Sequence, residues 1–199
     1  PVVMVSSFTE AGSDTTLKAL ELGAIDFIGK PRADGGKSME SYAEDLVEKL
    51  RAAKGARLRR AMTAQSSAPA TVPTLARPGL AASGKIIFVG ASTGGTEAIK
   101  EFLTGIPADC PPILIVQHMP DSFTASFARR LDGLCAPRVI EAQGNEKIES
   151  GTVYIAPGHS HLQIRRGNAG YVTELLASAP VNRHRPSVDV LFDSATALV

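Results

Sequence analysis

The stretch IIFVGASTGG, residues 86–95, decides the fold of the larger part of this chain. Residues 86–90 are a short apolar run of the kind that forms a buried strand in a parallel sheet. A glycine-rich turn that carries Ser92 follows at once, and residues 96–103 have the apolar spacing of a helix. A strand that passes through a tight turn into a helix is the unit from which α/β folds are built.

The next apolar run, residues 113–118, ends in Gln117 and His118. Successive strands of one parallel sheet end at the same edge, so Ser92 and His118 are expected to meet there. A serine hydroxyl beside an imidazole is the arrangement of a nucleophile and its general base. This pair is the strongest functional signal in the sequence, and it favours serine chemistry.

Residues 85–199 continue the alternation of strands and helices and are interpreted as one domain. The remaining elements are predicted as helices over residues 122–131 and 187–198 and as shorter strands over 139–142, 152–156, 162–165 and 171–175. The alternation predicts an α/β fold with a doubly wound parallel sheet. Such an architecture normally continues with another strand after Val199, so we expect the domain to lack its C-terminal end.

Residues 1–53 are interpreted as a smaller unit. Their pattern alternates in the same way, with strands expected over residues 1–7 and 24–28 and helices over 13–22 and 39–53. Residues 54–84 are basic at first and then rich in Ala, Ser, Thr and Pro, a composition typical of a linker. The sequence therefore predicts two domains that are joined by a linker.

The composition is that of an ordinary globular protein, with 44% apolar and 21% charged residues in 199. A net charge of +1 argues against a nucleic-acid binder or a membrane-surface protein. No run of about 18 apolar residues occurs, so no membrane insertion is expected. Cys110 and Cys135 are the only cysteines and lie far apart in the sequence, which favours free thiols and a cytoplasmic protein.

Two nucleotide-binding interpretations of the turn fail on specific residues. A dinucleotide-binding turn needs glycine where Ser92 stands, and a P-loop needs lysine where Thr96 follows Gly95. Residues 90–94 do satisfy G-x-S-x-G, which is a weak signal by itself. His118 on the very next strand departs from the Ser, acid, His order of the α/β-hydrolases. The alternative, a serine that merely caps a helix, is disfavoured by the histidine.

Four motifs together resemble the chemotaxis protein-glutamate methylesterases of the CheB type. They are VGASTGG at residues 89–95, IVQHMP at 115–120, YIAPG at 154–158 and NRHRPSVD at 182–189. PVVMVSS at residues 1–7 and AIDFIGKP at 24–31 resemble the last strands of a response-regulator receiver domain, which is flavodoxin-like. The resemblance implies a partial receiver over residues 1–53, a linker over 54–84 and a methylesterase domain over 85–199.

The resemblance implies a hydrolase that removes methyl esters from glutamate side chains of methyl-accepting chemoreceptors. Many members also deamidate receptor glutamines, and the receiver takes its phosphoryl group from the chemotaxis histidine kinase. On this sequence Ser92 becomes the nucleophile and His118 the general base. Thr93, Arg183 and His184 are expected to line the substrate pocket. The hydrolysis requires no metal and no organic cofactor.

The resemblance also assigns signalling residues in the receiver. Ser7, or Ser6 beside it, is expected to sense the phosphoryl group, and Lys30 is expected to pair with that group. The family's phosphorylated Asp and its acidic Mg²⁺ ligands lie upstream of Pro1. Mg²⁺ is therefore expected only for receiver phosphorylation, with ligands that are absent from this chain.

The third member of the family's catalytic triad is an Asp that is expected beyond Val199. The nearest downstream acids, Asp189 and Asp193, fall on the predicted helix over residues 187–198 rather than in a turn at a strand end. The chain thus resembles a protein that is truncated at both ends, and we expect it to be inactive as it stands because the Asp is missing.

Two alternatives stay open. His159 and His161 could bind a metal, but two histidines without a third ligand are a weak signal, and a loop histidine bonded to the backbone is favoured. The same scaffold could also be a non-catalytic, receiver-regulated adaptor that docks receptors or partner proteins.

Overall fold

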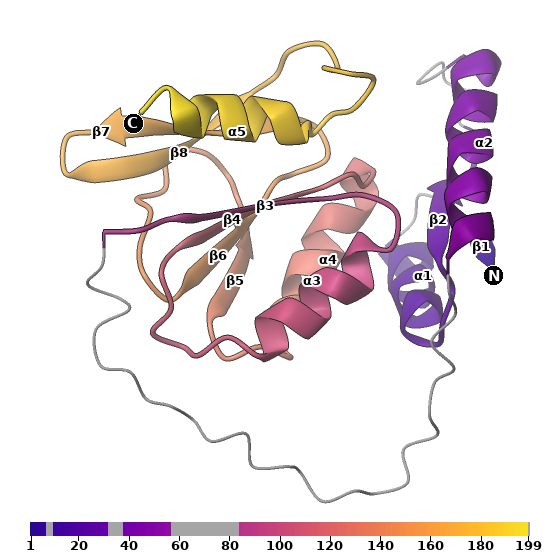
Figure 1. Ribbon diagram of the computed structural model, residues 1–199, viewed down its shortest axis with the longest axis horizontal. Coiled ribbons are helices and arrows are strands. Elements are labelled where there is room, and N and C mark those ends of the chain that lie inside the picture. Colours follow the sequence, from indigo (N-terminus) through magenta and orange to yellow (C-terminus); the bar gives the residue numbers. More distant parts are fainter. Residues whose placement is uncertain (7–9, 32–37, 57–83, 199) are drawn as a thin grey trace, which may run out of the picture.

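The computed structural model describes residues 1–6, 10–31, 38–56 and 84–198. They form a main part, built on a parallel sheet, and a smaller N-terminal part that packs against it (Figure 1). The elements in chain order are β1 (Val3–Ser6), α1 (Glu10–Glu21), β2 (Asp26–Gly29), α2 (Met39–Gly55), β3 (Ile87–Ala91), α3 (Gly95–Thr104), β4 (Ile113–Gln117), α4 (Asp121–Asp132), β5 (Arg138–Glu141), β6 (Thr152–Ile155), β7 (His161–Gly167), β8 (Gly170–Leu176) and α5 (Val188–Thr196).

The sheet of the main part has four parallel strands in the order β3-β4-β6-β5. β4 lies inside the sheet and all its residues are buried, as expected for a continuous apolar run in a parallel sheet. Ala91, the last residue of β3, pairs with Gln117, the last residue of β4. The chain therefore leaves both strands at the same sheet edge, and this register positions the site.

Both faces of the sheet are covered (Figure 1). On one face α3 and α4 pack with Ile113 and Ile115, and on the other face α5 and β7 pack with Leu114 and Val116. Successive residues of a strand point to opposite faces, so β4 contributes alternately to two apolar cores. The expected α/β fold with a parallel sheet is confirmed.

The second face differs from the predicted doubly wound pattern. β7 and β8 were expected as further short strands, but they pair antiparallel as a separate two-stranded sheet. Their connection between Gly167 and Gly170 is far too short for a parallel crossover, which needs a dozen or more residues. The hairpin and α5 therefore share the face that a doubly wound sheet would cover with helices alone.

The N-terminal part is a β-α-β-α unit in which β1 and β2 pair in parallel. Leu17, Leu20 and Phe27 of this part belong to the same apolar core as the side chains of α3 and α4. The ring centroids of Phe27 and Phe123 are 4.4 Å apart. Arg130 of α4 donates to Glu21 of α1 through Nε at 2.7 Å. These contacts pack the N-terminal part onto the main part. Most of the predicted linker, residues 57–83, lies outside the described residues.

Within the described part of the chain, no helix combines the length and the apolar character needed to cross a lipid bilayer. Cys110 and Cys135 are free thiols, in line with the expectation from their spacing. Burial raises the pKa of both thiols, which disfavours the reactive thiolate form.

Candidate active site

The turn between β3 and α3 presents Ser92 at the sheet edge. Gly94 adopts a left-handed conformation (φ 77°), which glycine accepts without strain. The Gly95 N–H donates to the Ser92 carbonyl at 2.8 Å and closes the turn. Because α3 begins at Gly95, the positive end of its dipole lies beside Ser92. The turn thus combines a hydroxyl with a helix terminus that favours negative charge.

His118 follows β4 directly and continues its pairing with β3. The His118 N–H donates to the Ala91 carbonyl at 3.0 Å, one step beyond the paired residues Ala91 and Gln117. Ser92 and His118 are therefore the first residues after two paired strand ends, and both line the same pocket. No hydrogen bond joins their side chains among the described residues; such bonds are often long before substrate binds.

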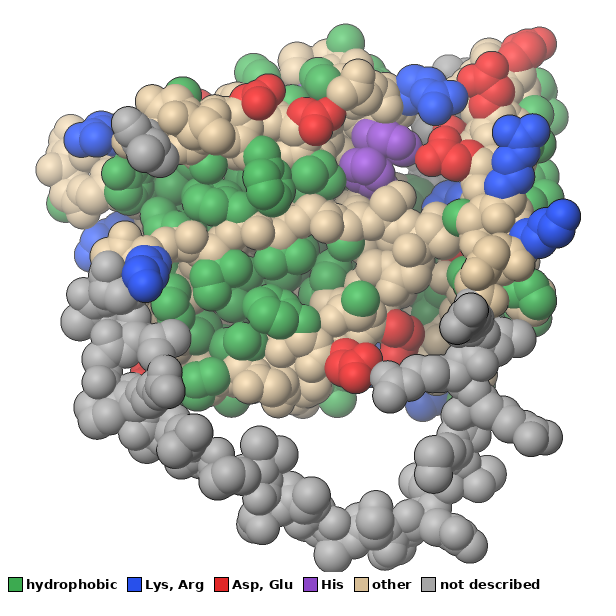
Figure 2. Space-filling model, viewed as in Figure 1, with side chains coloured by type: hydrophobic (Ala, Val, Ile, Leu, Met, Phe, Trp, Pro, Cys, Tyr) green, Lys and Arg blue, Asp and Glu red, His purple; other side chains and the backbone are tan. Residues whose placement is uncertain are grey.

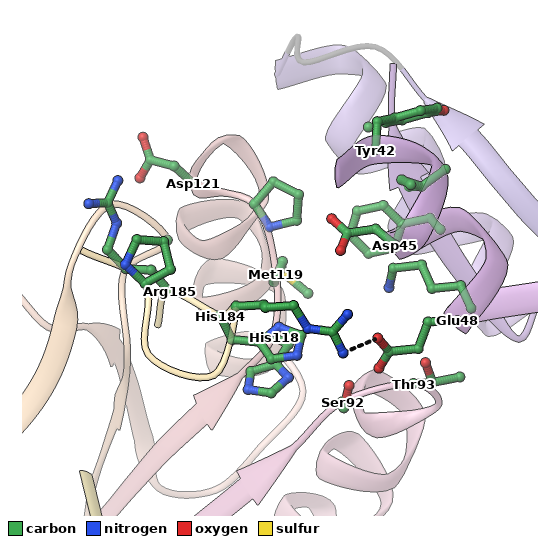
Figure 3. A pocket seen from close by; sticks show the side chains of 18 of the residues that line it. Tyr42, Asp45, Glu48, Ser92, Thr93, His118, Met119, Asp121, His184 and Arg185 are labelled. Carbon is green, nitrogen blue, oxygen red and sulfur yellow. Dashed lines mark ion pairs between the residues drawn. The ribbon is translucent and has the colours of Figure 1, made fainter. Parts of the chain in front are cut away.

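The His118 ring lies against a second imidazole. The ring of His184 stacks on it with a centroid distance of 3.8 Å and an interplanar angle of 15°. His184 comes from the loop before α5, where Asn182 (φ 48°) and Arg183 (φ 66°) are both left-handed. Left-handed residues other than glycine are uncommon and tend to occur at functional sites. Both Arg183 and His184 line the pocket, and Figure 3 shows His184 beside His118.

The environment of His118 favours its neutral form. Burial, followed by the charges of His184 and Lys49, lowers the pKa of His118 from its ordinary 6.5 to about 4. A neutral imidazole can accept a proton, which is what a general base requires. Nδ1 of the ring is buried and has no hydrogen-bond partner among the described residues. A buried polar atom of this kind normally has a partner.

Acidification is expected to destabilise the fold through His118. Because the pKa is lowered to about 4 in the folded protein, the unfolded chain binds this proton more readily. The free energy of unfolding therefore has its full value above about pH 6.5, where His118 is neutral in both states, and it decreases as the pH falls toward about 4. After allowance for solvent screening, we expect a loss of about 1 kcal/mol between pH 7 and pH 5. Urea unfolding should show that His118→Gln lacks this part of the pH dependence, and equal slopes would contradict the assignment.

The pocket has a volume of about 440 Å³ and lies between the N-terminal part and the main part. Figure 2 shows histidine side chains at this junction, flanked by acidic and basic groups. Six of the predicted site residues line the pocket, namely Ser92, His118, Thr93, Arg183, His184 and Lys30. Ser7, the remaining predicted residue, lies outside the described residues. The hydroxyl of Ser6 accepts a hydrogen bond from Thr16 at 2.6 Å.

Thr93 is held by a buried carboxylate of the N-terminal part. Its hydroxyl donates to Oδ2 of Asp26 at 2.7 Å, and Lys49 contacts the same oxygen at 2.8 Å. The other oxygen accepts from the Phe27 N–H at 2.7 Å. Asp26 is only 7% exposed, so these partners are what make its burial tolerable. Sequence reasoning missed Asp26 and Lys49, although an acid inside an apolar strand was a usable signal.

Arg183 connects the main part to α2. Its guanidinium lies 3.7 Å from carboxylate oxygens of both Glu44 and Glu48, which are one helical turn apart; the pair with Glu48 is dashed in Figure 3. All three side chains are largely exposed, so each pair contributes little to stability. Their position matters more than their energy, because α2 and Arg183 border the pocket that contains Ser92.

His161 is a structural histidine, as the sequence interpretation favoured. It is fully buried, its Nδ1 accepts from the Ser187 N–H at 3.0 Å, and its Nε2 faces the Ala179 carbonyl at 3.1 Å. Since a carbonyl can only accept, Nε2 is the donor in this contact. His159 faces Ser160 instead. The described residues contain no group of three or more His, Cys, Asp or Glu side chains arranged to hold a metal ion.

Comparisons with known proteins agree with one another. The profile of the CheB methylesterase family matches residues 87–199. The protein-glutamate methylesterase/protein-glutamine glutaminase 1 of Dechloromonas aromatica is 81% identical over 201 residues, which is 100% of this chain and 57% of the relative. The enzyme of that name from Nitrosomonas europaea is 53% identical over 197 residues, which is 98% of this chain and 55% of the relative.

A solved structure is also similar. The crystal structure of the Thermotoga maritima CheB methylesterase catalytic domain superimposes with a TM-score of 0.56 at 41% sequence identity. The superposition covers 58% of this chain and 62% of that chain. The chain spans little more than half the length of the curated relatives that it matches.

Proposed function

The chain belongs to the CheB methylesterase family, and we propose that it provides the catalytic pair of a chemotaxis hydrolase. The substrates proposed are methyl esters of glutamate side chains on methyl-accepting chemoreceptors, with deamidation of glutamines as a second activity. The names of the relatives support both activities. The observation that carries the proposal is the register of β3 and β4, which brings Ser92 and His118 into one pocket.

The reaction proposed for this pair has two stages. Ser92 Oγ attacks the γ-carbonyl carbon of the ester while His118 accepts the hydroxyl proton, and methanol leaves with that proton. A water molecule, deprotonated by His118, then attacks the acyl-enzyme; this frees the glutamate carboxylate and restores the Ser92 hydroxyl. With a glutamine substrate the leaving group is ammonia. Proton transfer by a positioned base contributes about 10²- to 10⁴-fold.

Negative charge develops on the carbonyl oxygen in both stages. The N-terminus of α3, whose dipole points its positive end at the turn, favours charge at this place. Backbone N–H groups that hold such an oxyanion are each worth about 3–4 kcal/mol in comparable hydrolases. The neutral state of His118 complements this arrangement, because a proton can be accepted as the charge forms.

An aspartate is proposed as the partner of His118 Nδ1. The role would be to fix the tautomer of the ring and to stabilise the imidazolium that forms during the reaction. Asp189 raises the pKa of His118, but less than burial, His184 and Lys49 lower it, and its carboxylate instead accepts a hydrogen bond from Asn182 at 2.5 Å. The partner is therefore proposed to come from outside the described residues.

The N-terminal part is proposed to be the end of a receiver domain that the chemotaxis histidine kinase phosphorylates in the cytoplasm. Its β-α-β-α order and the position of Lys30 after β2 support this proposal. Lys30 would pair with the phosphoryl group. The Mg²⁺ that phosphorylation requires is proposed to be held by acidic residues outside this chain. Asp26 and Glu48, which contact Thr93 and Arg183, support a regulatory contact between this part and the site.

The test uses a chimera in which this chain replaces the matching segment of the Dechloromonas aromatica relative, here called the chimera. The chimera is expected to release methanol from a methylated chemoreceptor. Binding of the receptor without methanol release would instead favour the adaptor function.

Weakening the contact between α2 and Arg183 is expected to raise this activity. Glu44→Gln combined with Glu48→Gln removes both ion pairs, which together contribute at most about 1 kcal/mol, so we expect about a two- to fivefold increase in the unphosphorylated chimera. The initial rate of methanol release measures the effect. Glu149→Gln, which breaks the exposed pair with Lys147, is the matched control. An unchanged or lower rate in the double variant would exclude this contact as a brake.

A further inference from the structure

Gln117 joins the backbone of Ser92 to that of His118. Its side-chain Nε2 donates to the Ser92 carbonyl at 2.9 Å and to the His118 carbonyl at 3.3 Å. Gln117 is the last residue of β4 and is only 4% exposed. One buried amide group therefore contacts both segments that carry the reacting side chains.

This amide does not face the substrate. Ile113 and Ile115 belong to the core beneath α3 and α4, and Gln117 continues the same alternation along β4. The His118 ring lies in the pocket against His184, whereas Gln117 is not among the residues that line the pocket. Any effect of Gln117 on the reaction must therefore pass through the backbone of Ser92 and His118.

The amide is packed closely against the turn that carries Ser92. A Cβ atom on Gly95 would come within 2.0 Å of Gln117 Oε1, so only glycine at this position leaves room for the amide. Oε1 is buried and has no hydrogen-bond partner among the described residues. A buried carbonyl without a partner costs about 1–3 kcal/mol, which an apolar side chain of similar size would avoid. Stability alone thus gives little reason for glutamine at this position.

We propose that Gln117 is a positioning residue for the hydrolysis, whose amide fixes the turn that carries Ser92 relative to His118. This inference rests on the proposed function. Nucleophile and base must be held closely, because a displacement of about 1 Å can cost about 10²-fold in rate. The pairing of β3 with β4 ends at the His118 N–H, so the amide is the next link between the two segments.

The first test is Gln117→Met in the chimera, since methionine keeps the length of the side chain but cannot donate. We expect kcat for methanol release to fall about 10- to 100-fold, with KM within about twofold of wild type. Tyr154→Phe is the matched control. The Tyr154 hydroxyl also makes two backbone hydrogen bonds, to Lys147 at 2.8 Å and from Glu149 at 3.1 Å, but away from the pocket. The control should lose stability and keep its kcat.

The second test displaces the amide without removing it. Gly95→Ala is expected to lower kcat, because the added methyl group would come within 2.0 Å of Oε1 and within 2.7 Å of the Ala91 Cβ; a double-mutant cycle with Gln117→Met isolates the part of the effect that acts through the amide. In this cycle Gln117→Met should add little to Gly95→Ala. Fully additive effects, a wild-type kcat in Gln117→Met, or an equal loss in Tyr154→Phe would each overturn the proposal. If Gln117→Met does not fold, the kcat of Gln117→Leu, which also lacks the donor, decides the matter in the same way.

The rate at which a fluorophosphonate modifies Ser92 separates this inference from the proposed function. A wild-type chimera that releases no methanol would refute the proposed function, yet slower modification in Gln117→Met would still support the positioning role. Normal methanol release by wild type and normal modification of Gln117→Met would refute the positioning role alone.

Discussion

Ser92→Ala in the chimera is expected to lower methanol release from a methylated chemoreceptor by at least about 10⁴-fold. The loss should be this large because Ser92 is the first residue after β3, beside His118, and the neighbouring hydroxyl of Thr93 instead donates to Asp26 at 2.7 Å. Without Oγ there is no acyl-enzyme, and only binding and charge stabilisation remain. Initial rates at saturating receptor measure the change.

Ser194→Ala is the control for this experiment. Ser194 also has a hydroxyl with backbone partners, since it donates to the Leu191 carbonyl at 2.7 Å and accepts from the Ile164 N–H at 3.1 Å. It lies on α5 and does not line the pocket. The control should keep its rate within about twofold. Turnover that survives in Ser92→Ala would show that the nucleophile is another residue.

The 199-residue chain by itself is expected to hydrolyse an ester about 10⁴-fold more slowly than the chimera. The reason is Nδ1 of His118, which is buried and has no partner among the described residues. A carboxylate at this atom sets the tautomer that leaves Nε2 free to accept a proton, and its loss has an effect of this size in serine proteases. Hydrolysis of a small ester compares the two proteins without the need to bind a receptor.

The same experiment includes His118→Gln in both proteins. In the chimera this change should bring the rate down to about the level of the unaltered chain, whereas in the chain it should have a much smaller effect. Far-UV circular dichroism checks that all four proteins are folded. Equal rates for the chain and the chimera would show that His118 needs no partner from outside the described residues.

The sequence was sufficient for the parts of the site that local patterns determine. The apolar runs before Ser92 and His118 predicted β3 and β4, and the general rule for parallel strands placed the two residues at one sheet edge. The glycines of the turn predicted the change from strand to helix. Each of these inferences depends on neighbours in the sequence, where periodicity and steric limits act directly.

The remaining contacts depend on how distant segments pack, which a single sequence does not determine. The stack of His184 on His118 requires a loop with two left-handed residues, and the bond from Thr93 to Asp26 requires the two parts to dock. Neither of these two contacts is indicated by a periodic pattern in the sequence. The hairpin of β7 and β8, in contrast, could have been predicted, because Gly167 and Gly170 leave only a short turn between two strands.

The burial of Gln117 could not be predicted from the sequence either. Its position at the end of β4 was evident, but a strand-end glutamine is usually exposed, and its burial follows only from the way α3 packs over the strand end. Because β3 and β4 end in register, the Gln117 amide can then donate to the backbone carbonyls of both Ser92 and His118. The choice of glycine at position 95 was the one hint in the sequence, and it was attributed to the turn alone.

Peptide mass mapping after reaction with a fluorophosphonate measures most directly whether Ser92 and His118 work as a pair. The chimera should carry the label on Ser92, and His118→Gln should slow the labelling of that residue by at least about 10²-fold, because a positioned base contributes this much. Label on a different residue, or labelling of Ser92 at the same rate without the histidine, would contradict the assignment of nucleophile and base.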